Sequence, residues 1–350
     1  MVCSAPAKSR GTEMLGNTPQ ERDYRLLAVL VLGLGLIPIF GPSNYLLGQA
    51  ALYLIWAAVV TQWNLVLGVA GIMSIGHLAL FAAGGYTVAL LGLYFGLSPW
   101  VSMPIAALAG FAVALLMGLA TLRLRGAYTV VVTLAIAMVM YQLIVTDVEC
   151  FRKTATACYS LTGGARGLTR FGDFGFAGLL GNGMAQTGNY LLAIALLGLC
   201  MLAAITIAHS PYGRAFQALR DSEPASQARG IRVEKFQLIV FAASGLLTGL
   251  AGAVYAGTQR TFGPQVLEFP TLLFLLSIMI VGGRGHVWGP VLGTLCLALV
   301  KESLTSFAQW QNSIYAVLLI VILIIAPEGL AGALSRLVAR PRAVKKEAAA

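Results

Sequence analysis

Charged residues are scarce in this sequence. Lys, Arg, Asp and Glu make up only 10% of its 350 residues, whereas hydrophobic residues make up 58%. Soluble globular domains carry roughly 25% charged residues, so this composition excludes an ordinary soluble protein. Several apolar runs approach the roughly 20 residues that a helix needs to cross a bilayer. The sequence therefore predicts an all-α, polytopic transmembrane helical bundle embedded in the lipid bilayer.

Ionisable side chains are also missing from the middle of the apolar runs, since Lys301 and Glu302 fall near a helix end. Carriers driven by protons or sodium usually bury such groups on their path, so a secondary transporter is disfavoured. The sequence lacks a G-x-x-x-x-G-K-[ST] loop, which excludes ATP hydrolysis by that route. If the chain transports a solute actively, we expect another polypeptide to supply the energy.

Cysteine is scarce, and its five residues are scattered along the chain. No Cys and His spacing suggests a metal site, and we expect no cofactor. Acid, base and nucleophilic groups do not converge either, so the sequence predicts no enzyme. Cys200 and Cys296 lie in apolar runs, where packing is their expected role. Cys150 and Cys158 fall in a loop expected outside the cell, as either a disulfide or two free thiols.

The net charge of +10 indicates topology rather than nucleic-acid binding, because the basic residues lie almost entirely between apolar runs. They gather in four places: residues 1–25, Arg123 with Arg125, residues 214–235, and the segment after Gly332. By the positive-inside rule we expect these segments, and so both termini, in the cytoplasm of a bacterium whose inner (plasma) membrane holds the chain. The long loop Asp147–Gly188 carries both signs of charge, and we expect it outside.

The apolar runs predict about eight to ten spans. Their approximate bounds are 26–41, 45–62, 78–97, 100–121, 127–146, 189–208, 236–258, 271–282, 288–308 and 312–327. Residues 271–282 form either a short crossing or a half-helix, which leaves the total open. We expect a cytoplasmic tail over 1–25, one transmembrane domain over 26–330, and a basic cytoplasmic tail over 331–350.

Two glycine-rich stretches, Gly68–His77 and Val281–Pro290, interrupt the apolar sequence. Broken helices in transporters commonly mark the translocation path. The candidate path residues are Ser74, Gly76, His77, Gly282, Gly283 and His286. Each also has a structural interpretation, since a histidine can bond a freed carbonyl and a glycine can serve close packing. Gly110, in an uninterrupted run, is expected to tolerate alanine.

A polar segment, residues 209–235, separates two strongly apolar runs. Pro211 and Gly213 predict a break, Arg214–Asp221 predicts about two helical turns, and Ser222 can cap a second short helix that ends at Gly230. This order is typical of a docking element for a soluble partner. The candidate contact residues are Arg214, Phe216, Leu219, Arg220, Asp221, Glu223 and Gly230. We expect Phe216 and Leu219 to fill a groove on the partner, beside the charged side chains.

In sequence order, these stretches resemble the LivM-type permease subunits of branched-chain amino acid ABC importers. The matching motifs are Ser74–Tyr86, Arg125–Tyr128, Thr162–Leu168, Pro211–Gly230, Gly249–Ala253, Gly282–Gly293 and Pro327–Leu330. The resemblance implies a transmembrane permease domain over 26–330, with the ATPase-coupling loop at 209–235.

The same resemblance implies four kinds of partner: two cytoplasmic ABC ATPase subunits, a second permease subunit, a periplasmic or extracellular solute-binding protein, and the bilayer. The implied cargo is leucine, isoleucine or valine. Gly282–Gly285 also resembles the urea-importer permeases, so urea or short amides are the alternative. A passive channel that works without ATP is a third possibility, and it would need no docking loop.

Overall fold

The computed structural model describes residues 19–124, 126–147, 149, 152–153, 158–181, 184–303, 317, 320 and 329–332. Arg125, Cys150 and most of the predicted span 312–327 lie outside this part of the chain, as do most of both tails. The choice between a Cys150–Cys158 disulfide and two free thiols therefore involves a residue outside the described part.

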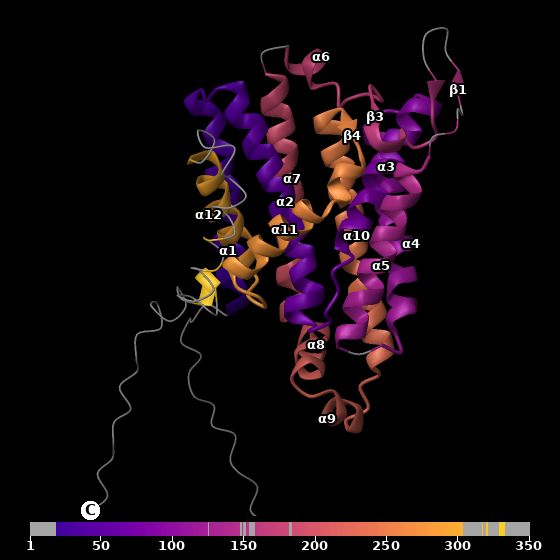
Figure 1. Ribbon diagram of the computed structural model, residues 1–350. Coiled ribbons are helices and arrows are strands. Elements are labelled where there is room, and N and C mark those ends of the chain that lie inside the picture. The colour runs from indigo at the N-terminus through magenta and orange to yellow at the C-terminus, as the bar shows by residue number, and fades with distance from the viewer. Residues whose placement is uncertain are drawn as a thin grey trace, which may run out of the picture.

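Seven helices in the described part are long and apolar enough to cross a membrane, which confirms the all-α membrane bundle (Figure 1). They are α1 (Pro19–Leu36), α2 (Asn44–Asn64), α3 (His77–Phe95), α4 (Pro99–Thr121), α5 (Ala127–Val145), α7 (Ala185–His209) and α10 (Val233–Gln259). A short 3-10 turn, η1 (Ile37–Phe40), extends α1. Helix α1 begins at Pro19, so its first turns are formed by polar residues that precede the first apolar run. The boundary between the polar tail and the transmembrane domain at residue 25 stays a prediction.

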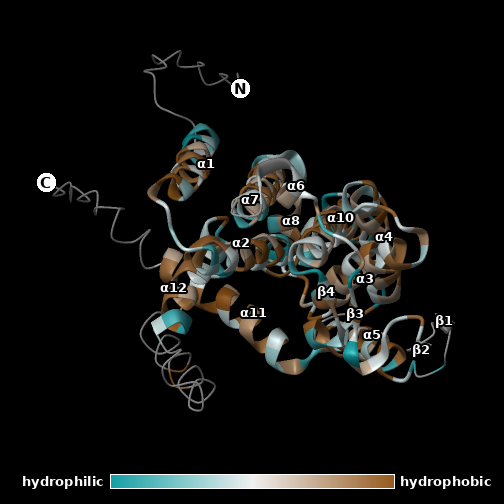
Figure 2. Ribbon diagram, turned by 90° about the horizontal axis from the view of Figure 1, so that it is seen from above, coloured by the Kyte–Doolittle hydropathy of each residue, from teal (hydrophilic) through white to brown (hydrophobic). Residues whose placement is uncertain are grey.

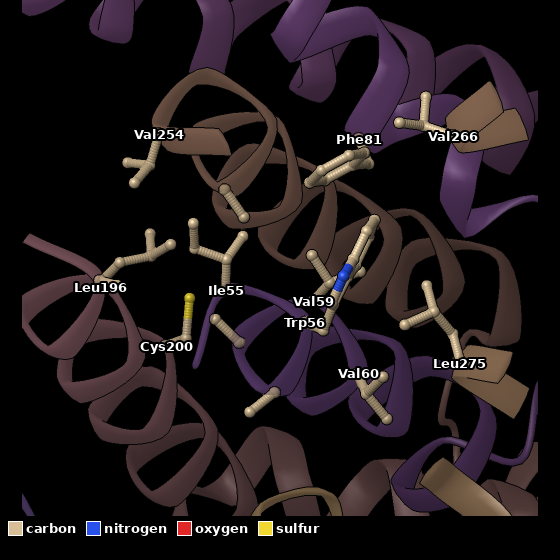
Figure 3. Packing of buried hydrophobic residues seen from close by; sticks show 14 of the residues in the cluster. Ile55, Trp56, Val59, Val60, Phe81, Leu196, Cys200, Val254, Val266 and Leu275 are labelled. Atoms are coloured by element: carbon tan, nitrogen blue, oxygen red, sulfur yellow. The ribbon is translucent and has the colours of Figure 1, made fainter. Parts of the chain in front are cut away.

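Helix α2 runs through the centre of the protein, whereas α1 lies at its edge (Figure 2). Ile55, Trp56, Val59 and Val60 on α2 are all buried. Figure 3 shows them among side chains from the surrounding helices, namely Phe81, Leu196, Cys200, Val254 and Leu275. A span that is apolar on all sides loses its amphipathic pattern, and this explains why the sequence does not reveal which spans are central.

Glycine residues line the close crossing of α4 and α10. A Cβ atom added to Gly110 would lie 2.6 Å from both the Gly245 oxygen and the Gly249 Cα. Small residues allow such backbone contact between membrane helices. The expectation that Gly110 tolerates alanine is therefore wrong, because the residue lies in this crossing and not on a free helix face.

Two shorter helices follow α10. Helix α11 (Phe269–Gly282) has 14 residues and runs obliquely across the bundle (Figures 1 and 2), and α12 (Gly289–Ser303) succeeds it. At 1.5 Å per residue, α11 is about 21 Å long, shorter than the roughly 30 Å hydrocarbon layer. The run 271–282 is thus a short helix that is not among the seven candidate spans.

The loop predicted to lie outside is folded. It holds the hairpin β1 (Arg152–Lys153) and β2 (Cys158–Tyr159), the turn η3 (Gly164–Arg166), and the short helix α6 (Phe176–Leu180). Its strand β3 (Leu168–Thr169) pairs with β4 (Thr261–Phe262), which follows α10 and leads into η4 (Pro264–Leu267). Figure 1 places these elements at one end of the bundle and the helices α8 (Pro211–Asp221) and α9 (Glu223–Ala228) at the other.

Candidate functional site

The first glycine-rich stretch breaks the helical path between α2 and α3. α2 widens into a π-helical turn, η2 (Leu65–Val69), residues 71–75 are irregular, and α3 begins at His77. Gly71 has φ +72°, a conformation that favours glycine. Two of the freed amides bond to protein, since Ile72 donates to the Val66 carbonyl at 3.0 Å and Ile75 donates to Thr133 Oγ1 at 3.1 Å. Protein groups thus replace part of the helical hydrogen bonding at this break.

A fully buried cluster of polar groups from α2, α3 and α10 lies next to this break. His77 Nε2 lies 2.6 Å from Ser244 Oγ, and the Ser244 hydroxyl donates to the Gln62 carbonyl at 3.1 Å. The single hydroxyl proton of Ser244 is thereby used, so Nε2 of His77 carries the proton that completes the pair. Trp63 stacks on the His77 ring and donates its indole N–H to the Ser74 carbonyl at 2.7 Å. Ser74 and His77 are both 0% exposed and belong to the core.

Gly76 is also buried. A Cβ atom at this position would lie 2.6 Å from the Thr133 carbonyl oxygen and would overlap Met117. Close packing against α4 and α5 therefore accounts for glycine here without an open path.

The second break separates α11, which ends at Gly282, from α12, which begins at Gly289. Gly283 and Gly285 have φ values of +102° and +80°, which side-chain-bearing residues rarely adopt. The His286 residue is exposed. Trp288 donates its indole N–H to Asp23 on α1 at 3.2 Å, and this ties the break to the first helix.

The structure brings the two breaks together through Asn64, the last residue of α2. Asn64 Oδ1 accepts from the Gly285 amide at 2.9 Å, and Asn64 Nδ2 donates to the His286 carbonyl at 2.9 Å. Asn64 is 3% exposed. The role of this residue was not predicted from the sequence, where its one signal is an amide side chain four residues before a glycine-rich stretch.

Helices α8 and α9 follow α7 at the end of the bundle opposite β1. α8 begins at Pro211, three residues earlier than predicted, because Ser210 caps it and accepts from the Gly213 amide at 3.2 Å. Ser222 occupies the N-cap position of α9 but makes no side-chain cap bond. Gly230 follows with φ +82°. The predicted helix–break–helix order is confirmed.

Some side chains of α8 pack against the rest of this chain, and others are exposed. Phe216 is only 2% exposed and packs into the core of this chain, so the expectation that it fills a partner's groove is wrong. Leu219 is partly buried, whereas Arg214 and Asp221 are exposed. Arg220 reaches inward and donates from Nη1 to the Gly68 carbonyl at 2.9 Å. On α9, Glu223 accepts from Gln227 at 3.0 Å.

A cavity of about 380 Å³ lies between these helices and the first break. Ile72, Met73 and Leu122 form part of its apolar wall, and Arg220 and Glu234 are among its charged residues. Within the described residues, no cluster of His, Cys, Asp or Glu could hold a metal ion.

The decisive comparison is with a family model described as the permease component of branched-chain amino acid transport systems, which matches residues 44–327. The chain belongs to this permease family. The protein is a multi-pass membrane permease of an ABC importer, a class that works with ATPase and substrate-binding subunits.

Two curated relatives are similar over most of this permease. It is 28% identical to the high-affinity branched-chain amino acid transport permease LivM of Escherichia coli, over 90% of this chain and 76% of that protein. It is 27% identical to the probable permease LivH of Methanocaldococcus jannaschii, over 72% of this chain and 82% of that protein. No solved structure matches the permease.

Proposed function

We propose that this permease imports leucine, isoleucine and valine across the bacterial inner membrane, with both its termini in the cytoplasm. The observation that carries the proposal is the similarity to LivM, a branched-chain amino acid permease, over 90% of this chain. An importer that is driven by separate ATPase subunits needs no proton- or sodium-coupling groups in the middle of its own spans. We keep urea and short amides as the alternative cargo that the Gly282–Gly285 motif raises.

In this proposal two ATPase subunits drive transport, a second permease subunit completes the pathway, and a solute-binding protein delivers the amino acid. One ATPase docks on α8 and α9, where Arg214 and Asp221 are exposed. Leu219 and Glu223 border the contact, and Gly230 ends the element. Phe216 contributes by holding α8 in place. Rearrangement of the ATPases on binding ATP moves this element and tilts the helices that it contacts.

We further propose that the two glycine breaks form the gate of the path. Ser74, Gly76 and His77 form its buried frame, whereas Met73, which is 52% exposed, lies on the side open to cargo. Gly282 and Gly283 allow the sharp turn between α11 and α12, and His286 serves through its carbonyl. The permease itself performs no covalent chemistry.

The test is uptake by the complete importer in proteoliposomes. The permease is reconstituted with its partner subunits, and entry of labelled leucine, valine and urea is followed with and without internal ATP. ATP-dependent uptake of leucine and valine, with none of urea, is the expected result. Preferential uptake of urea would replace the proposed cargo, and nucleotide-independent flux would indicate a channel.

A further inference from the structure

The ATPase-docking element and the two glycine breaks meet at a few atoms. Nη1 of Arg220 donates to the Gly68 carbonyl, and a Cβ atom on Gly285 would lie 3.2 Å from Nη1 and 3.3 Å from the Gly68 oxygen. A Cβ atom on Gly68 would lie 2.5 Å from the Gly285 amide nitrogen. Residues from α8, the first break and the second break, more than 60 positions apart at the closest, therefore share one small volume.

Asn64 holds this meeting point together. Its amide group bonds the second break from α2 at both ends, with Oδ1 on the Gly285 amide and Nδ2 on the His286 carbonyl. The Asn64 residue is 3% exposed, so its amide group depends on these two bonds for its polar partners. The two breaks are thereby fixed to each other on the side that faces α8.

We infer that Asn64 is a positioning residue that makes the two glycine breaks move as one gate, and that Arg220 transmits motion of α8 to this gate through the Gly68 carbonyl. The inference rests on the proposed transport function and adds the link by which a docking element opens a path. The π-turn η2 follows Asn64 directly and contains Gly68, so it joins the two contacts. The Asn64 bonds anchor the start of this turn to the second break.

The chain supplies a matched control on the same helix. Gln62, two residues before Asn64, is also a buried amide, and its Nε2 donates to the Cys200 carbonyl on α7 at 2.9 Å. Gln62→Leu and Asn64→Leu each remove a buried side-chain amide from α2. Only the second substitution disconnects the breaks, so a general loss of stability should affect both variants alike.

The experiment uses the reconstituted importer and measures leucine transported per ATP hydrolysed, together with hydrogen exchange at the Gly285 amide. Asn64→Leu should lower transport per ATP about tenfold, a typical size for a lost coupling between two sites, while ATP hydrolysis continues. Exchange at Gly285 should become faster, because this amide loses its acceptor. Gln62→Leu should change neither quantity.

Two further variants test the Asn64 bonds and the Arg220–Gly68 bond separately. They also keep the inference testable if Asn64→Leu fails to insert into the membrane. Asn64→Asp keeps the acceptor for Gly285 but places an oxygen against the His286 carbonyl, so Gly285 should stay protected while transport per ATP falls. Arg220→Met should lower transport per ATP without faster exchange at Gly285. Wild-type transport per ATP in Asn64→Leu and Asn64→Asp, or equal losses in Gln62→Leu, would overturn the inference. If the wild-type importer moves no leucine, the proposed cargo fails, whereas the exchange data still test the Asn64 bonds.

Discussion

Phe216 of α8 lies edge-on against Phe236 of α10, with ring centroids 5.8 Å apart and an interplanar angle of 86°. Tyr212, one turn earlier on α8, approaches the same ring at 6.0 Å. Edge-to-face pairs of this kind add to the free energy of burying the rings. The aromatic side chains of α8 thus pack against the transmembrane bundle. The opposite side of α8 is exposed and is the surface proposed to contact the ATPase.

We expect Phe216→Ala to loosen α8 and uncouple ATP hydrolysis from uptake. Truncating a buried phenylalanine to alanine typically lowers the free energy of unfolding by about 3–5 kcal/mol. Here the lost contacts are those that hold the short helix α8 against the bundle. Leucine uptake per ATP is the measurement, and Phe216→Leu should restore part of it by refilling the space. Phe40→Ala, which truncates an exposed phenylalanine in η1 away from α8, should remain at the wild-type level. Equal leucine uptake per ATP in Phe216→Ala and wild type would show that coupling does not need the packing of Phe216 against the bundle.

Arg214→Glu should weaken binding of the ATPase without disturbing insertion, because Arg214 is exposed and on the proposed docking side of α8. Reversing a charge at the rim of an interface mainly slows association and changes its salt dependence. Pull-down of the ATPase by the tagged permease at low and high salt measures this effect. Arg166→Glu, at the other end of the bundle, is the charge-matched control and should leave ATPase binding unchanged. Undiminished binding in Arg214→Glu would move the interface elsewhere.

Gly110→Ala should destabilise the permease even though it adds only a methyl group. The new Cβ would press on Gly245 and Gly249 of α10, and overpacking of this kind typically costs about 1–3 kcal/mol. The temperature at which the detergent-solubilised protein loses its monodisperse peak should fall. Gly33→Ala on α1, where a Cβ meets nothing within 4 Å, should leave that temperature unchanged. An unchanged value for Gly110→Ala would contradict the closeness of the α4–α10 crossing.

The two ends of the bundle should face opposite sides of the membrane. Ala225→Cys on α9 and Ala165→Cys in η3 are both at exposed positions and can be introduced singly into a cysteine-free background. An impermeant thiol reagent should label Ala165→Cys in intact cells and Ala225→Cys only after lysis. The reverse pattern would place α8 and α9 outside and exclude them from contact with a cytoplasmic ATPase.

The helical membrane class, most of the span positions, and the order of break and helix around α8 can all be predicted from the amino-acid sequence. Each of these features is local. Apolar run length, the missing amide of Pro211 and the positive φ of Gly230 act over a few residues, so they can be recognised without knowledge of the partners. The two glycine-rich interruptions are local features as well. Apolar sequence resumes after His77, where α3 begins, and ends at Gly282, where α11 ends.

Only the tertiary structure decided what each of these features contacts. It turned Phe216 inward, placed Gly110 in a helix crossing, and packed Gly76 against Thr133. It also joined Asn64 to Gly285, 221 positions later in the chain. Spans that are apolar on every side carry no amphipathic stripe to set their rotation, so close packing and a few buried hydrogen bonds between distant residues decide which faces meet.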